Sequence, residues 1–181
     1  GNQLIDTHIP RYLDKHIFVA IPNMGELKLS CVKSLLEFQS LCLSPEINIK
    51  PQFHMVKSSI IITGRNMCVQ AFLKSKCSHK LFIDSDIEFD PPSILMMLKA
   101  NKDIVLTPYP MKAVNWDKAR NMAAQSGRPI EECPYYYCME FPDKNNIESK
   151  DGLVEVKKGP AGCMLMKREV FEQMINAYPN L

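Results

Sequence analysis

The sequence predicts an α/β protein with a Rossmann-like, mostly parallel sheet flanked by helices. Three observations predict this fold class. Short apolar, β-branched runs alternate with longer stretches of helical periodicity, a pattern typical of strands joined by crossover helices. The length of 181 residues is that of one domain. The composition, 46% hydrophobic and 23% charged, is typical of a globular chain rather than a disordered one.

The first half of the chain predicts three strands separated by helices. Each expected strand is a short apolar run, and each expected helix carries apolar residues at three- and four-residue spacing. The expected elements are a strand over 16–21 ended by Pro22, a helix with Leu29, Val32, Leu35 and Leu36 on its apolar side, a strand over 53–56, a helix over 64–76 carrying Met67, Cys68, Ala71 and Phe72, and a strand over 80–83.

In the second half of the chain the alternation of strand and helix signals is weaker, and it becomes clear again near the end. Asp90 is expected to cap a helix that has Pro91 in its first turn and Ile94, Leu95 and Leu98 on its apolar side. A fourth strand is expected over 103–107. Further expected elements are a helix over 116–126, added strands over 135–137 and 154–156, a last strand over 162–166 and a closing helix over 168–177.

Charge and cysteine content exclude several classes of function. Lys and Arg number 22 and Asp and Glu 20, so the net charge of +2 gives no reason to expect nucleic-acid binding. No apolar run approaches the roughly 20 residues that span a bilayer, so no membrane span is expected. The seven cysteines form no CxxC pair, which disfavours a zinc site or a disulfide framework. A reducing, cytoplasmic location is therefore expected.

The strongest candidate for a functional site is Asp84-Ser85-Asp86. These residues follow the apolar strand Leu81-Phe82-Ile83 directly, and ligands of open α/β sheets bind at the carboxyl ends of strands. Two carboxylates one residue apart can turn toward one cation. Their oxygen ligands suit Mg²⁺ or Mn²⁺, which take their remaining ligands from water and phosphate. A solvated acidic turn is the simpler alternative, although Asp90 already serves to cap the next helix.

Three other segments are expected at the same edge of the sheet. Thr63-Gly64-Arg65-Asn66 would begin a helix, whose amides and Arg65 could bind a phosphate. Gly159-Pro160-Ala161-Gly162 precedes the last strand and would let the backbone approach a ligand closely. Pro22-Asn23-Met24 follows the first strand and could lie against a flat base. Each of these three could equally be an ordinary turn or helix start.

Taken in this order, the segments resemble the GT-A glycosyltransferases, which transfer a sugar from a nucleotide-sugar donor. The resemblance rests on the first strand Ile17–Pro22, the pair Arg65-Asn66, the Asp-x-Asp motif at 84–86 and the run Gly159–Phe171. It covers nearly the whole chain. It implies a single catalytic domain over 1–181, with a nucleotide-binding part at about 15–110 and an acceptor and sugar side at about 111–181.

The resemblance also implies roles for individual residues. Asp84 and Asp86 would bind the metal ion, Mn²⁺ or Mg²⁺, and Arg65 would face the diphosphate. The donor would be a nucleotide-diphosphate sugar, by analogy a UDP-hexose, and the acceptor is not identified. The remaining implied contacts are Ile21, Pro22 and Asn23 with the nucleoside, Ser85 with the ribose or phosphate, and Gly159, Ala161 and Gly162 with the transferred sugar.

The sequence departs from the family pattern in its last part. Many members have a His ligand after the Gly-rich strand, whereas no His follows His79 here, so a minimal or truncated member is implied. No catalytic base is selected among Glu140, Asp143 and Glu155. Two alternatives stay open: a module that binds a nucleotide sugar without transferring it, and a phosphatase similar to the haloacid dehalogenases, whose Asp and Thr motifs occur in the reverse order.

Overall fold

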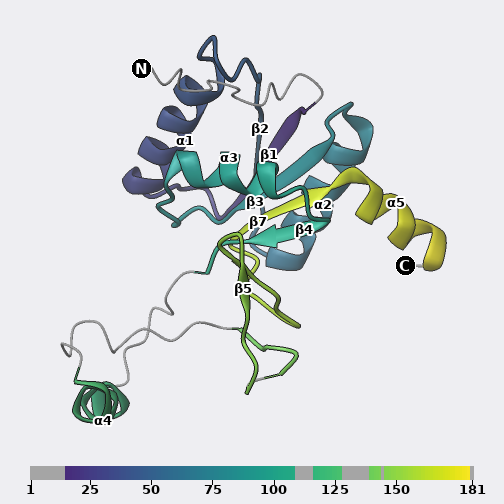
Figure 1. The fold of residues 1–181 in the computed structure, drawn as a ribbon. Helices are drawn as coiled ribbons and strands as arrows, with labels where there is room; N and C mark the ends of the chain where they lie inside the picture. Colours follow the sequence, from purple (N-terminus) through teal and green to yellow (C-terminus); the bar gives the residue numbers. More distant parts are fainter. Residues whose placement is uncertain (1–14, 109–115, 128–138, 144, 180–181) are drawn as a thin grey trace, which may run out of the picture. The chain divides into compact units, whose positions relative to one another are not determined.

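A computed structural model describes residues 15–108, 116–127, 139–143 and 145–179 (Figure 1). The chain divides into two compact units. The first unit comprises residues 1–105 and 162–181, and the second comprises residues 106–161, so the second is inserted into the sequence of the first. The strand expected over 135–137 lies outside the described residues.

The predicted order of elements is confirmed through most of the described chain. Its five longer strands and five helices are β1 (Ile17–Asn23), α1 (Leu29–Cys42), β2 (Gln52–Lys57), α2 (Ile61–Lys74), β3 (His79–Ile83), α3 (Pro91–Ala100), β4 (Ile104–Leu106), α4 (Trp116–Ser126), β7 (Cys163–Lys167) and α5 (Arg168–Ala177). The short pair β5 (Ser149–Lys150) and β6 (Leu153–Val154) lies in the second unit.

Two boundaries differ from the prediction in ways that affect the site. β1 continues two residues past the expected stop, because Pro22 and Asn23 still pair with Val56 and Lys57 of β2. The second helix begins at Ile61 rather than near residue 64. Arg65 therefore lies in the second turn of α2 and not at its N-terminus.

The main sheet confirms the α/β class, but its strands do not all run the same way. The strand order is β2-β1-β3-β7-β4. β1 pairs in parallel with both β2 and β3, whereas β7 is antiparallel to β3. β7 enters beside the end of β3, with Cys163 opposite Ile83, and runs back to Lys167 opposite His79. The sheet is therefore mixed.

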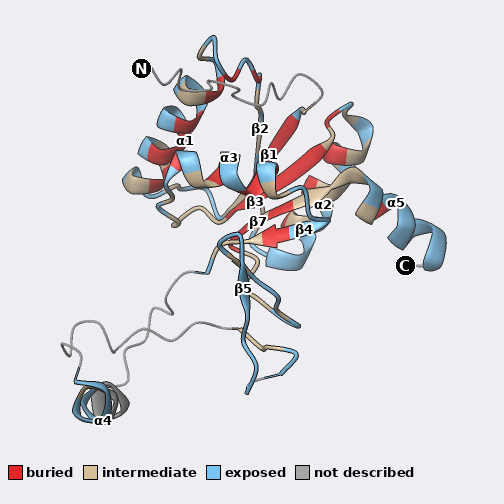
Figure 2. Cartoon of the chain, viewed as in Figure 1, coloured by how far each residue is buried: buried red, intermediate tan, exposed pale blue. Residues whose placement is uncertain are grey.

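Helices cover both faces of this sheet, and buried residues follow its central strands (Figure 2). On one face Phe18 of β1 and Phe82 of β3 join a core cluster with Phe72 of α2 and Phe171 of α5. Because side chains alternate along a strand, Val19 and Leu81 point to the opposite face. Both are fully buried. The helices α1 and α3 lie against each other.

The helix α1 is confirmed, but of the apolar side predicted for it only Leu35 is buried and Leu29 and Leu36 are not. Leu29 and Leu36 are 84% and 59% exposed. The buried side consists of Cys31, Ser34, Leu35, Phe38 and Cys42. Apolar residues occur on both sides of this helix, so spacing alone does not identify the side that packs.

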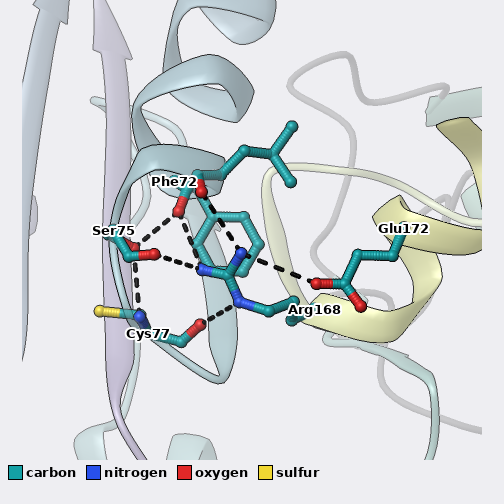
Figure 3. A network of polar contacts seen from close by, with 6 residues as sticks. Phe72, Ser75, Cys77, Arg168 and Glu172 are labelled. Atoms are coloured by element: carbon teal, nitrogen blue, oxygen red, sulfur yellow. Dashed lines mark hydrogen bonds and ion pairs between the residues drawn. The ribbon is translucent and has the colours of Figure 1, made fainter.

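The C-terminus of α2 is held by the first residue of α5. Figure 3 shows the Arg168 guanidinium donating hydrogen bonds to the backbone carbonyls of Phe72, Ser75 and Cys77, at 3.1, 2.8 and 2.9 Å. The last carbonyls of a helix have no partner within the helix, and Arg168 provides one. This contact fixes the end of α2 and, with it, the helix that carries Arg65.

Candidate functional site

The carboxyl ends of β1 and β3 form the natural ligand site of this sheet. From β1 the chain moves to β2 on one side, and then to β3 on the other side of β1. Two parallel strands whose connections leave in opposite directions create a crevice between their loops, where α/β proteins bind ligands. Asn23 ends β1 and Asp84-Ser85-Asp86 follows β3. The structure therefore places the acidic pair beside this crevice.

The loop that carries the acidic pair is held in place by α1. The Lys28 amide, just before the helix, donates to the Ser85 carbonyl at 2.9 Å, and the Cys31 thiol lies 3.7 Å from the Asp84 carbonyl. One turn further on, the Ser34 hydroxyl accepts the Phe89 amide at 3.1 Å. Three successive contacts along one side of α1 thus fix residues 84–89.

Asp84 is also held from the other face of the sheet. Its carboxylate oxygen Oδ1 lies 3.0 Å from Nη2 of Arg65, and the two side chains are 33% and 27% exposed. Its amide donates to the Gly162 carbonyl at 2.8 Å. Arg65 can reach the Asp84 carboxylate because α2 packs closely against the end of β1. A Cβ on Gly64 would lie 3.0 Å from Ser58 and 3.5 Å from Pro22. Gly64 therefore has a packing role.

The two carboxylates act together on one neighbouring thiol. Burial raises the pKa of Cys31 to about 11, and the negative charges of Asp86 and Asp84 add to this effect. Both carboxylates are therefore near enough to Cys31 to act on its thiol through their charge.

A lysine lies inside the core, on the strand that leads to the acidic pair. Lys80 of β3 is fully buried, and its Nζ has no hydrogen-bond partner among the described residues. Nζ lies 3.0 Å from the ring centroid of Phe82 and 4.6 Å from that of Phe171. Burial lowers the pKa of Lys80 to about 7. The Arg65 guanidinium lies over the same Phe82 ring, at 5.4 Å.

The residues expected to contact a nucleoside are placed differently from one another. Ile21 is fully buried in the core, so only its backbone could reach a ligand. The Asn23 side chain shapes its own loop, donating to the Ile21 carbonyl and accepting the Gly25 amide at 3.1 and 2.9 Å. Pro22 is partly exposed at the end of β1, and Ser85 is partly exposed between the two acids.

The Gly-rich turn is divided between the two units. Gly162 belongs to the first unit and contacts Asp84 through its carbonyl, whereas Gly159 and Ala161 belong to the second. A Cβ on Gly159 would collide with the Leu106 side chain of the same unit. This glycine therefore also has a packing role.

The three candidates for a catalytic base also lie in the second unit. Glu140 forms ion pairs with Lys157 and Lys158, at 3.1 and 3.3 Å. Asp143 accepts the Asn145 amide at 2.8 Å in a local turn, and Glu155 is exposed. These contacts do not select one of the three.

Sequence reasoning missed two supports of the 84–89 loop and one buried lysine on β3. Cys31 and Ser34 carry no signal that marks them as supports of the 84–89 loop. Lys80 does carry one, because a lysine inside the apolar run His79–Ile83 is unusual for a strand buried on both faces. Among the described residues, no three or more His, Cys, Asp or Glu side chains gather into one cluster that could hold a metal ion. The described helices are also all too short or too polar to cross a membrane.

Comparison with known proteins shows the fold and nothing finer. No protein-family model and no curated protein matches the chain. Among solved structures, the fold is similar to that of the crystal structure of A197 from STIV, with a TM-score of 0.51. The identity is 18%, and the match covers 88% of this chain and 68% of that one. At this identity the likeness concerns the arrangement of the backbone.

Proposed function

We propose that the chain is a metal-dependent glycosyltransferase of the GT-A fold, which transfers a hexose from a nucleotide-diphosphate sugar to an acceptor. UDP-hexose is the proposed donor, by analogy with the family that the sequence resembles. The buried free thiols, which include Cys31 and Cys68, support a reducing, cytoplasmic setting for this activity.

The observation that carries the proposal is the place of the acidic pair. Asp84 and Asp86 follow the central strand β3 at the crevice between β1 and β3, where an α/β sheet binds its ligand. A carboxylate pair repels a diphosphate unless a dication lies between them. Two acids at the ligand-binding edge therefore favour a ligand that is bound through a metal ion.

The chemistry of these side chains fits Mn²⁺ or Mg²⁺. Asp84 and Asp86 would provide two oxygen ligands, and such ions complete their shell with water and phosphate oxygens. When bound, the ion would neutralise the charge that develops on the departing nucleoside diphosphate.

The chain's own residues would then position the donor. Arg65 holds Asp84 at 3.0 Å and carries further N–H groups that can bind a phosphate oxygen. The contacts from Lys28, Cys31 and Ser34 keep the 84–89 loop rigid, so that the acids need not reorganise on binding. No residue is assigned as catalytic base.

Calorimetry on Asp86→Asn tests the site. UDP-, GDP- and CDP-hexoses are titrated with Mn²⁺ and with a chelator. We expect one of them to bind the unchanged protein only with the metal, and Asp86→Asn to lower that affinity by at least about tenfold. Glu88→Gln, an exposed acid two residues on, is the matched control and should bind normally. Unchanged binding by Asp86→Asn would refute the assignment.

A binding module without transferase activity is the second candidate. It is favoured by Glu140, whose carboxylate is already paired with two lysines, and by the absence of any assigned base. Metal-dependent binding combined with no release of sugar from the bound donor, either to water or to an acceptor, would support it. Release of phosphate from an aryl phosphate would instead favour a phosphatase.

A further inference from the structure

Four large apolar side chains protrude from two neighbouring loops of the first unit. Met24 follows β1, Ile60 lies between β2 and α2, and Ile61 and Ile62 are the first two residues of α2. Their exposed fractions are 74%, 60%, 69% and 72%. We call these four residues the apolar rim. An exposed apolar cluster of this kind in a globular protein marks a surface that contacts something apolar.

The two loops lie side by side. The Ser58 amide donates to the Asn23 carbonyl at 2.8 Å. The side chain of Lys57 passes over Gly25, because a Cβ placed there would lie 3.4 Å from its Cε atom. Met24 and Ile60 are therefore each one or two residues from a direct contact between the loops, so the apolar rim is formed by two adjoining loops.

The geometry of the three isoleucines favours a fluid partner over a shaped one. Successive residues of a helix point about 100° apart, so Ile61 and Ile62 leave the end of α2 in different directions, and Ile60 precedes the helix in an extended conformation. A rigid protein groove could enclose one or two such side chains. The acyl region of a bilayer surrounds all of them.

The charges beside the apolar rim fit an anionic surface. The first turn of α2 contains no acidic residue, and Ile60 provides no side-chain cap for its amides. This end of the helix is therefore positive and can donate to phosphate groups. Lys57 adds a positive charge beside this helix end. The loop after β1 carries one positive charge, Lys28, and one negative charge, Glu26. Exposed apolar side chains beside a lysine and the free amides of a helix N-terminus can bind at the level of lipid headgroups.

We propose that the apolar rim is a peripheral binding surface for an anionic lipid bilayer. Ile60, Ile61, Ile62 and Met24 enter the boundary between headgroups and acyl chains. The α2 amides and Lys57 contact the phosphates. This surface does not depend on the reaction proposed above, so either proposal can fail without the other.

Co-sedimentation of the full chain with vesicles tests the proposal. One set of vesicles contains phosphatidylcholine with a minor share of phosphatidylglycerol, and the other contains phosphatidylcholine alone. We expect binding to the anionic vesicles. The double variant Ile61→Ser, Ile62→Ser should lower the partition coefficient by about tenfold or more, the loss expected for two isoleucines that no longer enter the bilayer. Lys57→Gln should lower it about fivefold, and only for the anionic vesicles.

The matched control is Leu36→Ser, Met96→Ser, which removes two side chains that are 59% and 69% exposed on α1 and α3. It should bind as the unchanged protein does, and the melting temperatures of both double variants should match. Three results would overturn the proposal. They are an absence of binding to anionic vesicles, an equal loss of binding in the control, and a dimer in solution that dissociates when the isoleucines are replaced.

Discussion

Arg65 and Asp84 form an ion pair before any ligand is bound. Each side chain is about one-third exposed, so the pair is only partly screened by solvent. A dication that binds Asp84 must share or displace this guanidinium. A diphosphate, in contrast, gains a positive partner from it. Arg65 therefore has opposite effects on the two components of a metal–nucleotide complex.

Replacing Arg65 by Gln should separate these effects. The variant lacks the competing cation, so the affinity of the free chain for Mn²⁺ should rise by about threefold. The affinity for the nucleoside diphosphate in the presence of Mn²⁺ should fall by about tenfold, because a charge-assisted contact to phosphate is lost. Calorimetry with the metal alone, and then with both components, measures the two changes. If both affinities rise or both fall, Arg65 does not both compete with the metal for Asp84 and bind the diphosphate.

At the scale of the element, α2 depends on contacts at both of its ends. Its start packs against Pro22 through Gly64, and its end is bound by Arg168 of α5. Arg168 also stacks on Phe72, with its guanidinium carbon 4.6 Å from the ring centroid. A residue 91 positions away from Cys77 thus determines where α2 stops and how firmly it is held.

Arg168→Ala should therefore destabilise the fold without touching the acidic pair. The variant removes the charged donor from the carbonyls of Leu73, Ser75 and Cys77, at and just after the end of α2, and the expected loss is about 3 kcal/mol of unfolding free energy. Arg168→Lys should lose less unfolding free energy, because one ammonium can replace some of the hydrogen bonds that the guanidinium donates. Urea denaturation measures both.

Glu172→Gln is the control for this helix end. Glu172 pairs with Arg168 at 4.0 Å and is 53% exposed, so its contribution should stay within about 0.5 kcal/mol. A loss in Glu172→Gln as large as that in Arg168→Ala would show that the ion pair, rather than the bonds to carbonyls, holds the helix end.

The elements that sequence predicts best are those with one strong local signal. The closing helix over 168–177 was expected from its pattern and is found with the same bounds. The side of α1 that packs was not predictable, because Leu29 and Leu36 match the helical period as well as Cys31 and Phe38 do. Choosing between them requires the position of α3, which no local pattern contains.

At the scale of the molecule, long-range pairing limits what the sequence reveals. The position of Asp84 and Asp86 could be predicted, because it follows from the end of one apolar strand. The direction of β7 could not, since its pairing with β3 joins residues about eighty positions apart across the inserted second unit. The ion pair of Arg65 with Asp84 was missed for a similar reason: it requires α2 to begin at Ile61 and to pack on β1.

Global stability should depend on pH through one buried lysine and several buried thiols. Lys80 has a folded pKa of about 7 against an ordinary value of 10.5. Between these values the unfolded chain binds a proton that the folded chain does not, so stability rises with pH. Below about pH 7 Lys80 is protonated in both the folded and the unfolded chain, so it no longer makes stability depend on pH.

The thiols act in the opposite direction at higher pH. Burial raises the pKa of Cys31 to about 11 and that of Cys42 to about 12, and it raises those of Cys68 and Cys77 as well. Above their ordinary value of 9.0 the unfolded chain releases these protons while the folded chain keeps them, so stability falls with pH. Above pH 9 the loss of stability from the four thiols exceeds the gain from Lys80. The free energy of unfolding should therefore be largest near pH 9.

Lys80→Met isolates the lysine from the thiols. In the unchanged protein the free energy of unfolding should rise by about 2 kcal/mol between pH 7 and pH 9, because Lys80 contributes close to one proton across that interval. The variant should be the more stable of the two at pH 7, lack this rise and keep the fall above pH 9. Urea denaturation in a series of buffers measures the three effects. A rise between pH 7 and pH 9 that persists in Lys80→Met would show that the ammonium of Lys80 is already solvated in the folded state, and that the Phe82 and Phe171 rings do not enclose a neutral amine.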